Sequence, residues 1–399
     1  MNIAEIQSAL AELDLDGWLF YSFRGSDPIA TEILEIGTGG PLATRRWFYL
    51  IPRTGEPVKI VHAIERESLA HLPGRKHVYL PWKQLHGFVK SELHALASGR
   101  PARVAMQYSP NGAIPYVSRV DAGIIELIRS FGVDVATSAT LVQKFQSTLT
   151  DSQLVSHEQA AKDVYEIVHG AFGEIAKRIK SRIPTTEYDI QQYIMNEFAD
   201  RSLVTHDAPI VGVNANSASP HYEPTIDVHA PINEGDFVLI DLWAKCISAD
   251  CVYADITWTG FVGTTVPDEF TSVFNIVRDA RDAAAEFVRD EIGAGNPVSG
   301  AEVDDVCRDV IAAAGYGDLF IHRTGHSIQT QIHANGANID NLETEDKRLL
   351  IPRTLFSIEP GIYLEHRFGV RSEIDMYVGD KEARITGGAP QREIVKILA

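Results

Sequence analysis

The spacing of apolar residues along the first 140 positions alternates between a helical and a strand-like period. Apolar residues recur at helical intervals in three segments, 3–13, 64–72 and 118–131. Short runs rich in aromatic and β-branched residues, which are typical of strands, lie beside them at 18–21, 46–51, 58–62, 103–106 and 133–136. This alternation predicts an α/β domain whose sheet is at least partly parallel.

The pattern changes near residue 150, where longer helical segments begin. Thr150 can cap a helix, and helical spacing continues from there to about residue 183. Pro184 ends this helix, and a second one follows. We therefore expect two domains, an N-terminal domain of residues 1–150 and a C-terminal domain of residues 151–399.

The C-terminal domain combines long helices with strand-like runs. After the first helix we expect helices that end near residue 199 and that cover 268–292 and 301–314. Strand-like runs occur at 209–213, 237–244, 252–260, 355–358 and 369–378. Helices beside a largely antiparallel sheet predict an α+β layer domain.

Composition and charge exclude several classes of protein. Of the 399 residues, 45% are apolar, which is enough for sizeable cores and too much for a disordered chain. The net charge is −18, and residues 151–399 carry the excess, with 21 Lys or Arg against 40 Asp or Glu. Such an acidic chain lacks the basic face that binds nucleic acid or an anionic membrane. We expect neither partner.

The cysteines and the N-terminal residues bear on the compartment. Cys246, Cys251 and Cys307 form neither an even disulfide framework nor a thiolate metal motif, so we expect reduced thiols and a cytoplasmic location. The first residues lack the basic and apolar regions of a signal peptide. No run reaches the roughly 18 apolar residues of a membrane span.

Five positions in the last 160 residues have the order and spacing of a hydrolytic metal site. They are Asp241, Asp255, His326, Glu359 and Glu373. Four carboxylates and an imidazole form a hard, oxygen-rich set, which suits Mn²⁺, Zn²⁺, Co²⁺ or Fe²⁺ better than a metal that prefers thiolates. Bridging carboxylates can hold two ions about 3.5–4 Å apart, and such a pair can activate one water.

The motifs around these positions resemble those of the pita-bread metallopeptidases: aminopeptidase P, prolidase, methionine aminopeptidase and the metal-free creatinase. The motifs are Tyr-Ala-Asp-Ile-Thr from residue 253, His-Arg-Thr-Gly-His from 322, Glu-Pro-Gly from 359 and Gly-Val-Arg-Ser-Glu from 369. Residues 1–150 are similar to the N-terminal domain of aminopeptidase P and creatinase in pattern and position only. The resemblance implies a C-terminal α+β pita-bread domain preceded by a smaller α/β domain of the creatinase type.

One departure from the family concerns the two aspartates. Thirteen residues separate Asp241 from Asp255, where the family usually has ten, so the hairpin that carries them is three residues longer. An insertion in the turn leaves the phase of both strands intact. Tyr253 and Thr257 flank Asp255 at a period of two, whereas Asp250 has no such frame. We therefore expect Asp255, and not Asp250, to be the second ligand.

The resemblance implies a role for each of the five positions. Asp241 would chelate one metal ion, Asp255 and Glu373 would bridge both ions, and His326 and Glu359 would complete the second. We expect two divalent ions per chain, Mn²⁺ in the first place and Co²⁺ or Zn²⁺ as alternatives.

Further side chains match catalytic or substrate-binding positions of the proline-specific branch. Three are histidines: His221, His322 and His333. A neutral imidazole can donate to a scissile carbonyl or a substrate carboxylate and can relay protons. Glu359 can take the proton of the nucleophile and pass it to the leaving nitrogen. Thr257 and Arg371 are expected beside the ligand carboxylates.

These features together predict a proline-specific metallo-exopeptidase. We expect a prolidase that cleaves Xaa-Pro dipeptides with a metal-activated hydroxide, and the resemblance implies a homodimer. The alternatives are an Xaa-Pro aminopeptidase that acts on longer peptides, a creatinase-like amide hydrolase, or a homologue that binds without catalysis. Trp258 stands where the family usually has arginine, and Ser327 and Gln329 replace two usual glycines, which leaves room for another amide or ester substrate.

Overall fold

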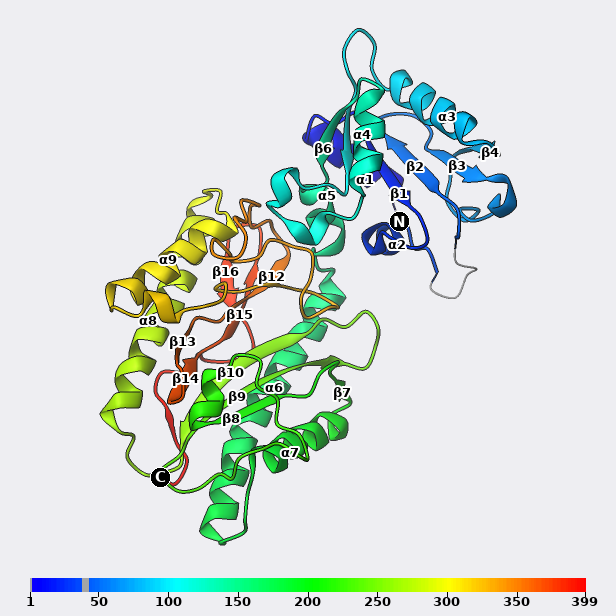
Figure 1. Cartoon of the computed structure of the whole chain (residues 1–399). Coiled ribbons are helices and arrows are strands. Elements are labelled where there is room, and N and C mark those ends of the chain that lie inside the picture. Colours follow the sequence, from blue (N-terminus) through cyan, green and yellow to red (C-terminus); the bar gives the residue numbers. More distant parts are fainter. Residues whose placement is uncertain (1, 38–42) are drawn as a thin grey trace. The chain divides into compact units, whose positions relative to one another are not determined.

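The computed structural model describes residues 2–37 and 43–399, with the elements labelled in Figure 1. The chain divides into two compact units, Met1–Gln146 and Ser147–Ala399. Among the described residues, none of the helices has both the length and the apolar character needed to cross a membrane.

The N-terminal unit contains a six-stranded sheet in the order β4-β3-β2-β1-β5-β6. Its strands are β1 (Gly17–Ser22), β2 (Trp47–Pro52), β3 (Val58–His62), β4 (Arg75–Tyr79), β5 (Arg103–Met106) and β6 (Asp134–Thr137). β1 pairs in parallel with β5, β5 with β6, and β3 with β4, while β2 runs antiparallel to both of its neighbours. The expected partly parallel sheet is confirmed.

Within residues 2–37 and 43–146, five helices cover the two faces of this sheet. They are α1 (Ile3–Glu12), α2 (Pro28–Ile33), α3 (Trp82–Ala95), α4 (Ala122–Ser130) and α5 (Ala139–Gln146). Alternate residues of β1 enter different apolar clusters. Trp18 packs with residues of α1, α2 and α5, and Leu19 packs with residues of α3 and α4. Each face of the sheet therefore has a core of its own.

The helix expected over 64–72 is wrong. The chain forms one 3₁₀ turn at Ala63–Glu65, followed by separate turns in which the N–H groups of residues 68, 70 and 72 donate to carbonyls three residues back. Leu69 and Leu72 are nevertheless buried in the core, which explains their helix-like spacing. Leu69 and Leu72 are apolar because they are buried in the core and not because they lie on one face of a helix. Pro73 also disfavours a helical conformation at the residue before it.

The C-terminal unit contains four long helices, α6 (Asp151–Lys180), α7 (Glu187–Asp200), α8 (Asp268–Ala294) and α9 (Gly300–Ala313). Three of them begin with a capping box. In each, the N-cap hydroxyl accepts a hydrogen bond from the backbone N–H of the third helical residue, and the side chain of that residue accepts one from the N-cap backbone N–H. The N-cap residues are Thr150, Thr186 and Ser299. The predicted starts of these helices thus have a local cause.

Two sheets and a hairpin lie among these helices. The first sheet has the order β17-β10-β9-β7 with β8 also on β9, and the second has the order β11-β12-β15-β16. The strands are β7 (Leu203–Val204), β8 (Ile210–Val213), β9 (Phe237–Cys246), β10 (Ala254–Phe261), β11 (Ser327–Ile328), β12 (Thr354–Ile358), β13 (Gly361–Leu364), β14 (Phe368–Arg371), β15 (Ile374–Val378), β16 (Ala383–Ile385) and β17 (Val395–Lys396). All pairs except β10 with β17 are antiparallel. The α+β class is confirmed.

Residues of β9 and β10 alternate between two sides of the first sheet. Ile240 and Ile256 pack with α6 and α7 in one apolar cluster. Phe237 and Phe261 join a second cluster with α8, α9 and the strands of the other sheet. Figure 1 shows α6 running along β9 and β10, with α8 on the side of β12 to β16. Odd-numbered residues of the two strands therefore face the space between the sheets.

Two expectations for this unit need correction. The single strand expected over 369–378 is wrong, because Ser372 and Glu373 interrupt it between β14 and β15. The expectation of three reduced thiols is also wrong, because Cys246 and Cys251 form a disulfide with a Cα–Cα distance of 5.6 Å, and only Cys307 is a free, buried thiol. The register of β9 and β10 brings the two ends of their connecting loop together, and this places the cysteines side by side.

Candidate metal centre

The β9–β10 hairpin presents two aspartates and a threonine on one face. Asp241 of β9 pairs directly with Thr257 of β10. Asp255, two residues before Thr257, pairs with Trp243, two residues after Asp241. Because side chains alternate along a strand, all of these residues project to the same side, away from α6. The aspartates and Thr257 are buried. Asp250 lies exposed in the turn of the hairpin.

The other three acid and imidazole groups come from the second sheet and its connections. His326 immediately precedes β11, Glu359 follows β12, and Glu373 lies in the interruption before β15. The Ser357 hydroxyl accepts from the His326 N–H at 3.0 Å and donates to Glu359 Oε1 at 3.1 Å. The Glu373 N–H donates to the Thr257 carbonyl at 3.2 Å. These bonds bring β10 and the second sheet to one site.

The candidate ligand atoms converge closely. One atom each of Asp255, His326 and Glu373 lies within 4.8 Å of the others. His326 Nε2 is 3.5 Å from Asp255 Oδ2 and 3.3 Å from Glu359 Oε1. Four of the five predicted positions are thus brought together directly.

Asp241 joins the group through an arginine. The Arg371 guanidinium donates to Asp241 Oδ2 and, at 3.0 Å, to Thr257 Oγ1. The Thr257 hydroxyl in turn donates to Glu373 Oε2 at 2.7 Å. Arg371 and Thr257 therefore lie beside the acidic groups, and they orient one oxygen of Asp241 and one of Glu373.

Burial strongly affects the ionisation of these groups. Loss of water raises the pKa of Asp255 and Glu373 well above the ordinary range, and the neighbouring carboxylates add to the effect. Burial also raises the pKa of Asp241, although the positive charge of Arg371 opposes this rise. Burial would also raise the pKa of Glu359, but the positive fields of His326, His322 and Arg371 outweigh it and lower that pKa.

The arrangement fits divalent cations. Asp241 Oδ1, Asp255 Oδ1 and Glu373 Oε1 are buried and have no hydrogen-bond partner among the described residues. Buried polar atoms without a partner are costly and need an explanation. Four clustered carboxylates also face one buried arginine, Arg371, so negative charge is left uncompensated. Oxygen atoms of this kind are the preferred ligands of hard divalent ions.

The three additional histidines occupy different surroundings. The His333 ring lies edge-on to His326 with 4.4 Å between centroids, and the field of His326, followed by burial, lowers the His333 pKa to about 3. Burial lowers the pKa of His322 to about 4, and its Nε2 contacts Tyr363 Oη at 2.7 Å. His221 is exposed, yet its charge contributes to the low pKa of His333. All three rings can therefore act in the same region.

Sequence reasoning missed Glu187, which supports the segment that carries His221. This buried carboxylate accepts from the Val213 N–H at 2.7 Å, the Ala230 N–H at 2.6 Å and the Tyr222 hydroxyl at 2.6 Å. Glu187 therefore binds the segment 213–230 at both ends and, through Tyr222, in its middle. The capping box of α7 marks Glu187 as the first helical residue, but nothing in the sequence indicates its burial.

Two more residues at the centre were missed. Tyr363 Oη lies between His322 and Arg371, at 2.7 Å and 3.4 Å. Asp375 is buried and accepts from the Asp255 N–H at 2.8 Å, while its other oxygen lacks a partner among the described residues. The signal for Asp375 was its spacing of two from Glu373, which places both side chains on one side of an extended chain.

Comparison with known proteins identifies a matching family and a curated relative. A family model described as metallopeptidase family M24 matches residues 159–380, more than half of the chain. A putative Xaa-Pro aminopeptidase of Mycoplasma genitalium is 31% identical over 235 residues, which cover 58% of this chain and 61% of the relative. The chain thus spans about three fifths of the length of this curated relative.

Solved structures extend the likeness to nearly the whole chain. The crystal structure of dipeptidase PepE from Mycobacterium ulcerans has a TM-score of 0.67 at 21% identity, over 98% of this chain and 96% of that chain. An X-prolyl aminopeptidase from Caenorhabditis elegans, described as a cytosolic enzyme with a di-nuclear active site, has a TM-score of 0.61 at 20% identity, over 94% and 58% of the two chains. At these identities the comparison shows a shared fold.

Proposed function

The chain belongs to metallopeptidase family M24, and from this premise we propose that it is a dinuclear metallo-exopeptidase that hydrolyses the Xaa-Pro bond of dipeptides. The observation that carries the proposal is the buried carboxylate cluster with three oxygens that lack hydrogen-bond partners among the described residues. Such a cluster is costly for folding unless cations occupy it.

The proposed metal ligands are the five positions found in the sequence. Asp241 would hold one ion, Asp255 and Glu373 would contribute to both, and His326 and Glu359 would complete the second. When bound, the pair supplies Lewis-acid activation of a water molecule and of the scissile carbonyl. Mn²⁺ is the proposed metal, because the ligand set is rich in oxygen.

The protein's own groups would then handle the protons. Glu359 has a lowered pKa, so its carboxylate is ionised at neutral pH and can accept the proton of the attacking water. It can return this proton to the nitrogen that leaves. His333 is neutral at that pH, because its pKa is about 3, and its N–H can donate to the carbonyl oxygen as negative charge develops there.

The proposed specificity for proline makes a further demand on the site. The bond before proline is a tertiary amide whose nitrogen carries no hydrogen, so the site must recognise the ring without that donor. We assign His221 to the carboxylate of the dipeptide. His322 would act through Tyr363, because its Nδ1 donates to the Arg323 carbonyl and its Nε2 contacts Tyr363 Oη, each at 2.7 Å, and Arg371 is held by Asp241. A longer peptide lacks a carboxylate at this place. Losing one charge-assisted hydrogen bond costs about 1.5–3 kcal/mol, or roughly ten- to a hundredfold in specificity.

The deciding experiment compares peptides on metal-loaded protein. The protein is stripped with a chelator, reloaded with Mn²⁺, and assayed on Xaa-Pro and on Xaa-Pro-Yaa with the same first residue. We expect no activity after stripping, recovery on reloading, and a preference for the dipeptide. Equal or faster cleavage of the tripeptide would assign the chain to Xaa-Pro aminopeptidases. Full activity in metal-free protein would reject the metal mechanism.

A second outcome would change the substrate class. If metal-loaded protein cleaves neither peptide, the metal centre stands but the proline specificity does not. Ser327 and Gln329, next to His326, would then point to another amide or ester, whereas Trp258 packs on α6 and does not face the metal centre. We further propose a cytoplasmic homodimer without nucleic-acid or membrane partners. The likeness to the cytosolic Caenorhabditis elegans enzyme supports this location, whereas the cysteines do not, because two of them are joined. Sedimentation equilibrium checks the dimer, and a particle with the mass of one chain would contradict it.

A further inference from the structure

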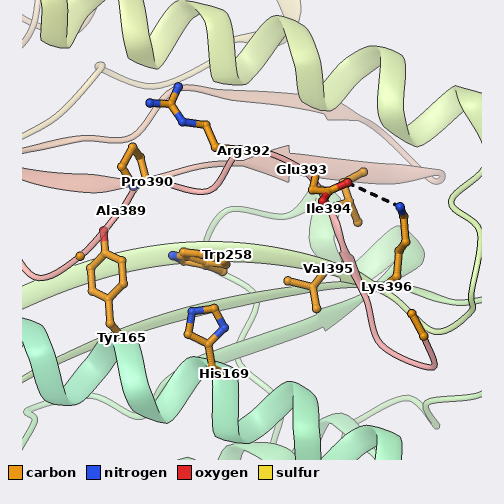
Figure 2. Close-up of a pocket in the computed structure, with 12 residues that line it drawn as sticks. Tyr165, His169, Trp258, Ala389, Pro390, Arg392, Glu393, Ile394, Val395 and Lys396 are labelled. Atoms are coloured by element: carbon orange, nitrogen blue, oxygen red, sulfur yellow. Dashed lines mark ion pairs between the residues drawn. The ribbon is translucent and has the colours of Figure 1, made fainter.

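A second cavity lies in the C-terminal unit, against α6 and β10. It measures about 690 Å³, a size typical of small-molecule sites. Figure 2 shows Tyr165 and His169 rising from α6, Trp258 on β10, and the segment 389–396 forming the opposite wall. Pro390, Ile394 and Val395 make that wall largely apolar.

This cavity is separate from the metal centre. Asp255 and Thr257 project from β10 to the space between the sheets, whereas Trp258 belongs to the cluster packed on α6. The two sites therefore lie on opposite faces of one strand. None of the cavity-lining residues is among the five proposed metal ligands.

Two residues of the cavity wall each carry a buried polar atom that has no hydrogen-bond partner among the described residues. These atoms are Trp258 Nε1 and Tyr165 Oη. Trp258 is only 8% exposed and Tyr165 only 7% exposed. The indole nitrogen can act only as a donor, and burial raises the pKa of Tyr165, so its hydroxyl also keeps its proton. Both groups require an acceptor, and a ligand can provide one.

The remaining polar groups of the wall are mostly donors as well. The His169 ring lies edge-on to Trp258 at 4.6 Å, and burial lowers its pKa, so the neutral ring offers one N–H. Arg392 and Lys396 stand at the rim with side chains 69% and 45% exposed, and Arg392 also donates to Asp282 Oδ2 at 2.6 Å. Glu393 contributes a carboxylate side chain to the wall, with Lys396 Nζ 3.5 Å from it, and the last residue, Ala399, lines the cavity as well.

We propose that this cavity binds a small organic acid with a flat apolar body, such as an arylalkyl carboxylate. The ring of the acid packs against Trp258, Tyr165 and the apolar wall. Its carboxylate accepts from the indole N–H and from His169, and Arg392 and Lys396 favour the negative charge. This inference is independent of the proposed peptidase activity.

Fluorine NMR of the full-length protein tests the site directly. The chain has five tryptophans, so 5-fluorotryptophan labelling gives one resonance for each, and Trp258→Phe identifies the resonance of Trp258. The metal-loaded protein is titrated with 3-phenylpropionate and, separately, with 3-phenylpropanol. We expect the Trp258 resonance to move saturably with the acid, and the alcohol to bind at least tenfold more weakly. No movement of that resonance, or equal binding of the alcohol, would overturn the proposal.

Surface variants locate the carboxylate without disturbing the core. The double variant Arg392→Gln, Lys396→Gln should weaken binding of the acid at least fivefold. Arg367→Gln, which changes an arginine with a 59% exposed side chain outside the cavity, should leave it unchanged. Unaltered affinity in the double variant would refute the site. Loss of the Trp258 shift in His326→Ala, with the double variant unaffected, would place the acid at the metal centre and also refute it.

Discussion

Asp250 and Asp255 lie five positions apart and have opposite surroundings. Asp255 is 5% exposed and groups with His326 and Glu373, whereas Asp250 is exposed in the turn. We predict that Asp255→Asn abolishes binding of the second Mn²⁺ ion, because a bridging carboxylate needs both oxygens charged. Asp250→Asn, the matched control, should bind two ions. Titration calorimetry measures both, and the reverse result would show that Asp250 is the ligand.

His157 makes stability depend on pH. It is fully buried on α6, and its ring nitrogens contact the Tyr253 carbonyl and Thr386 Oγ1, each at 2.7 Å. Burial lowers its pKa from 6.5 to about 4. Between these values the unfolded chain binds the proton and the folded chain does not. His157 therefore contributes stability above pH 6.5 that is lost as pH falls towards 4, about 3 kcal/mol in all.

We predict that His157→Gln flattens this dependence. Urea unfolding between pH 7 and pH 4.5, at one fixed metal content, should show a smaller loss of stability in the variant than in the parent protein. His366→Gln is the control, because the His366 side chain is 90% exposed. Equal pH slopes for the parent and His157→Gln would contradict the role assigned to the buried ring.

The residues with chemical function were easier to find from sequence than the residues that support them. Glu359 and Glu373 stand in short motifs whose order carries the information. Glu187 and Asp375 are carboxylates without such a motif, and their importance comes from backbone N–H groups of segments distant in sequence. Hydrogen bonds to distant backbone leave no pattern of side chains that a sequence alone could show.

Elements with local causes were predicted well, and those set by tertiary contacts were not. α6 starts at its capping box, and β9 and β10 follow their apolar runs. β4 was missed because it is an edge strand with polar, mostly exposed residues. The interruption before β15 was missed because it depends on the bond from the Glu373 N–H to the Thr257 carbonyl, over a hundred residues away.

The disulfide should stabilise the hairpin that carries two proposed metal ligands. Cys246 and Cys251 are separated by five positions, so the bond closes a short loop, and closure of such a loop is worth about 2 kcal/mol. We predict that reductant lowers the free energy of unfolding of the parent protein by this amount. Urea titrations with and without dithiothreitol measure it.

A paired variant provides the control for this measurement. Cys246→Ala, Cys251→Ala should match the reduced parent and should not respond to reductant, while Cys307 stays unchanged in both proteins. A parent protein that is equally stable with and without reductant would mean that the two thiols are not joined in solution.

At the scale of the molecule, the two units have separate cores. Apolar clusters of the first unit include none of the residues beyond 146, and those of the second begin at Leu149. All five proposed ligands belong to the second unit. The predicted architecture, a pita-bread domain after a smaller α/β domain, agrees with the family match and with the structural likeness over 98% of the chain.

We therefore predict two transitions in calorimetry, of which one depends on metal. Excess Mn²⁺ at a hundred times its dissociation constant should stabilise the C-terminal unit by about 2.7 kcal/mol for each bound ion and leave the other transition in place. A chelator should reverse the shift. One transition that moves as a whole would show that the two units unfold together.

Strand β10 carries the metal centre on one face and the organic-acid cavity on the other, and Thr257 and Trp258 are adjacent in it. Two ligands that share one strand are subject to thermodynamic reciprocity. If the acid changes the affinity for Mn²⁺ by some factor, Mn²⁺ must change the affinity for the acid by that same factor. A single coupling constant would then describe both sites, and it can be measured from either side of the strand.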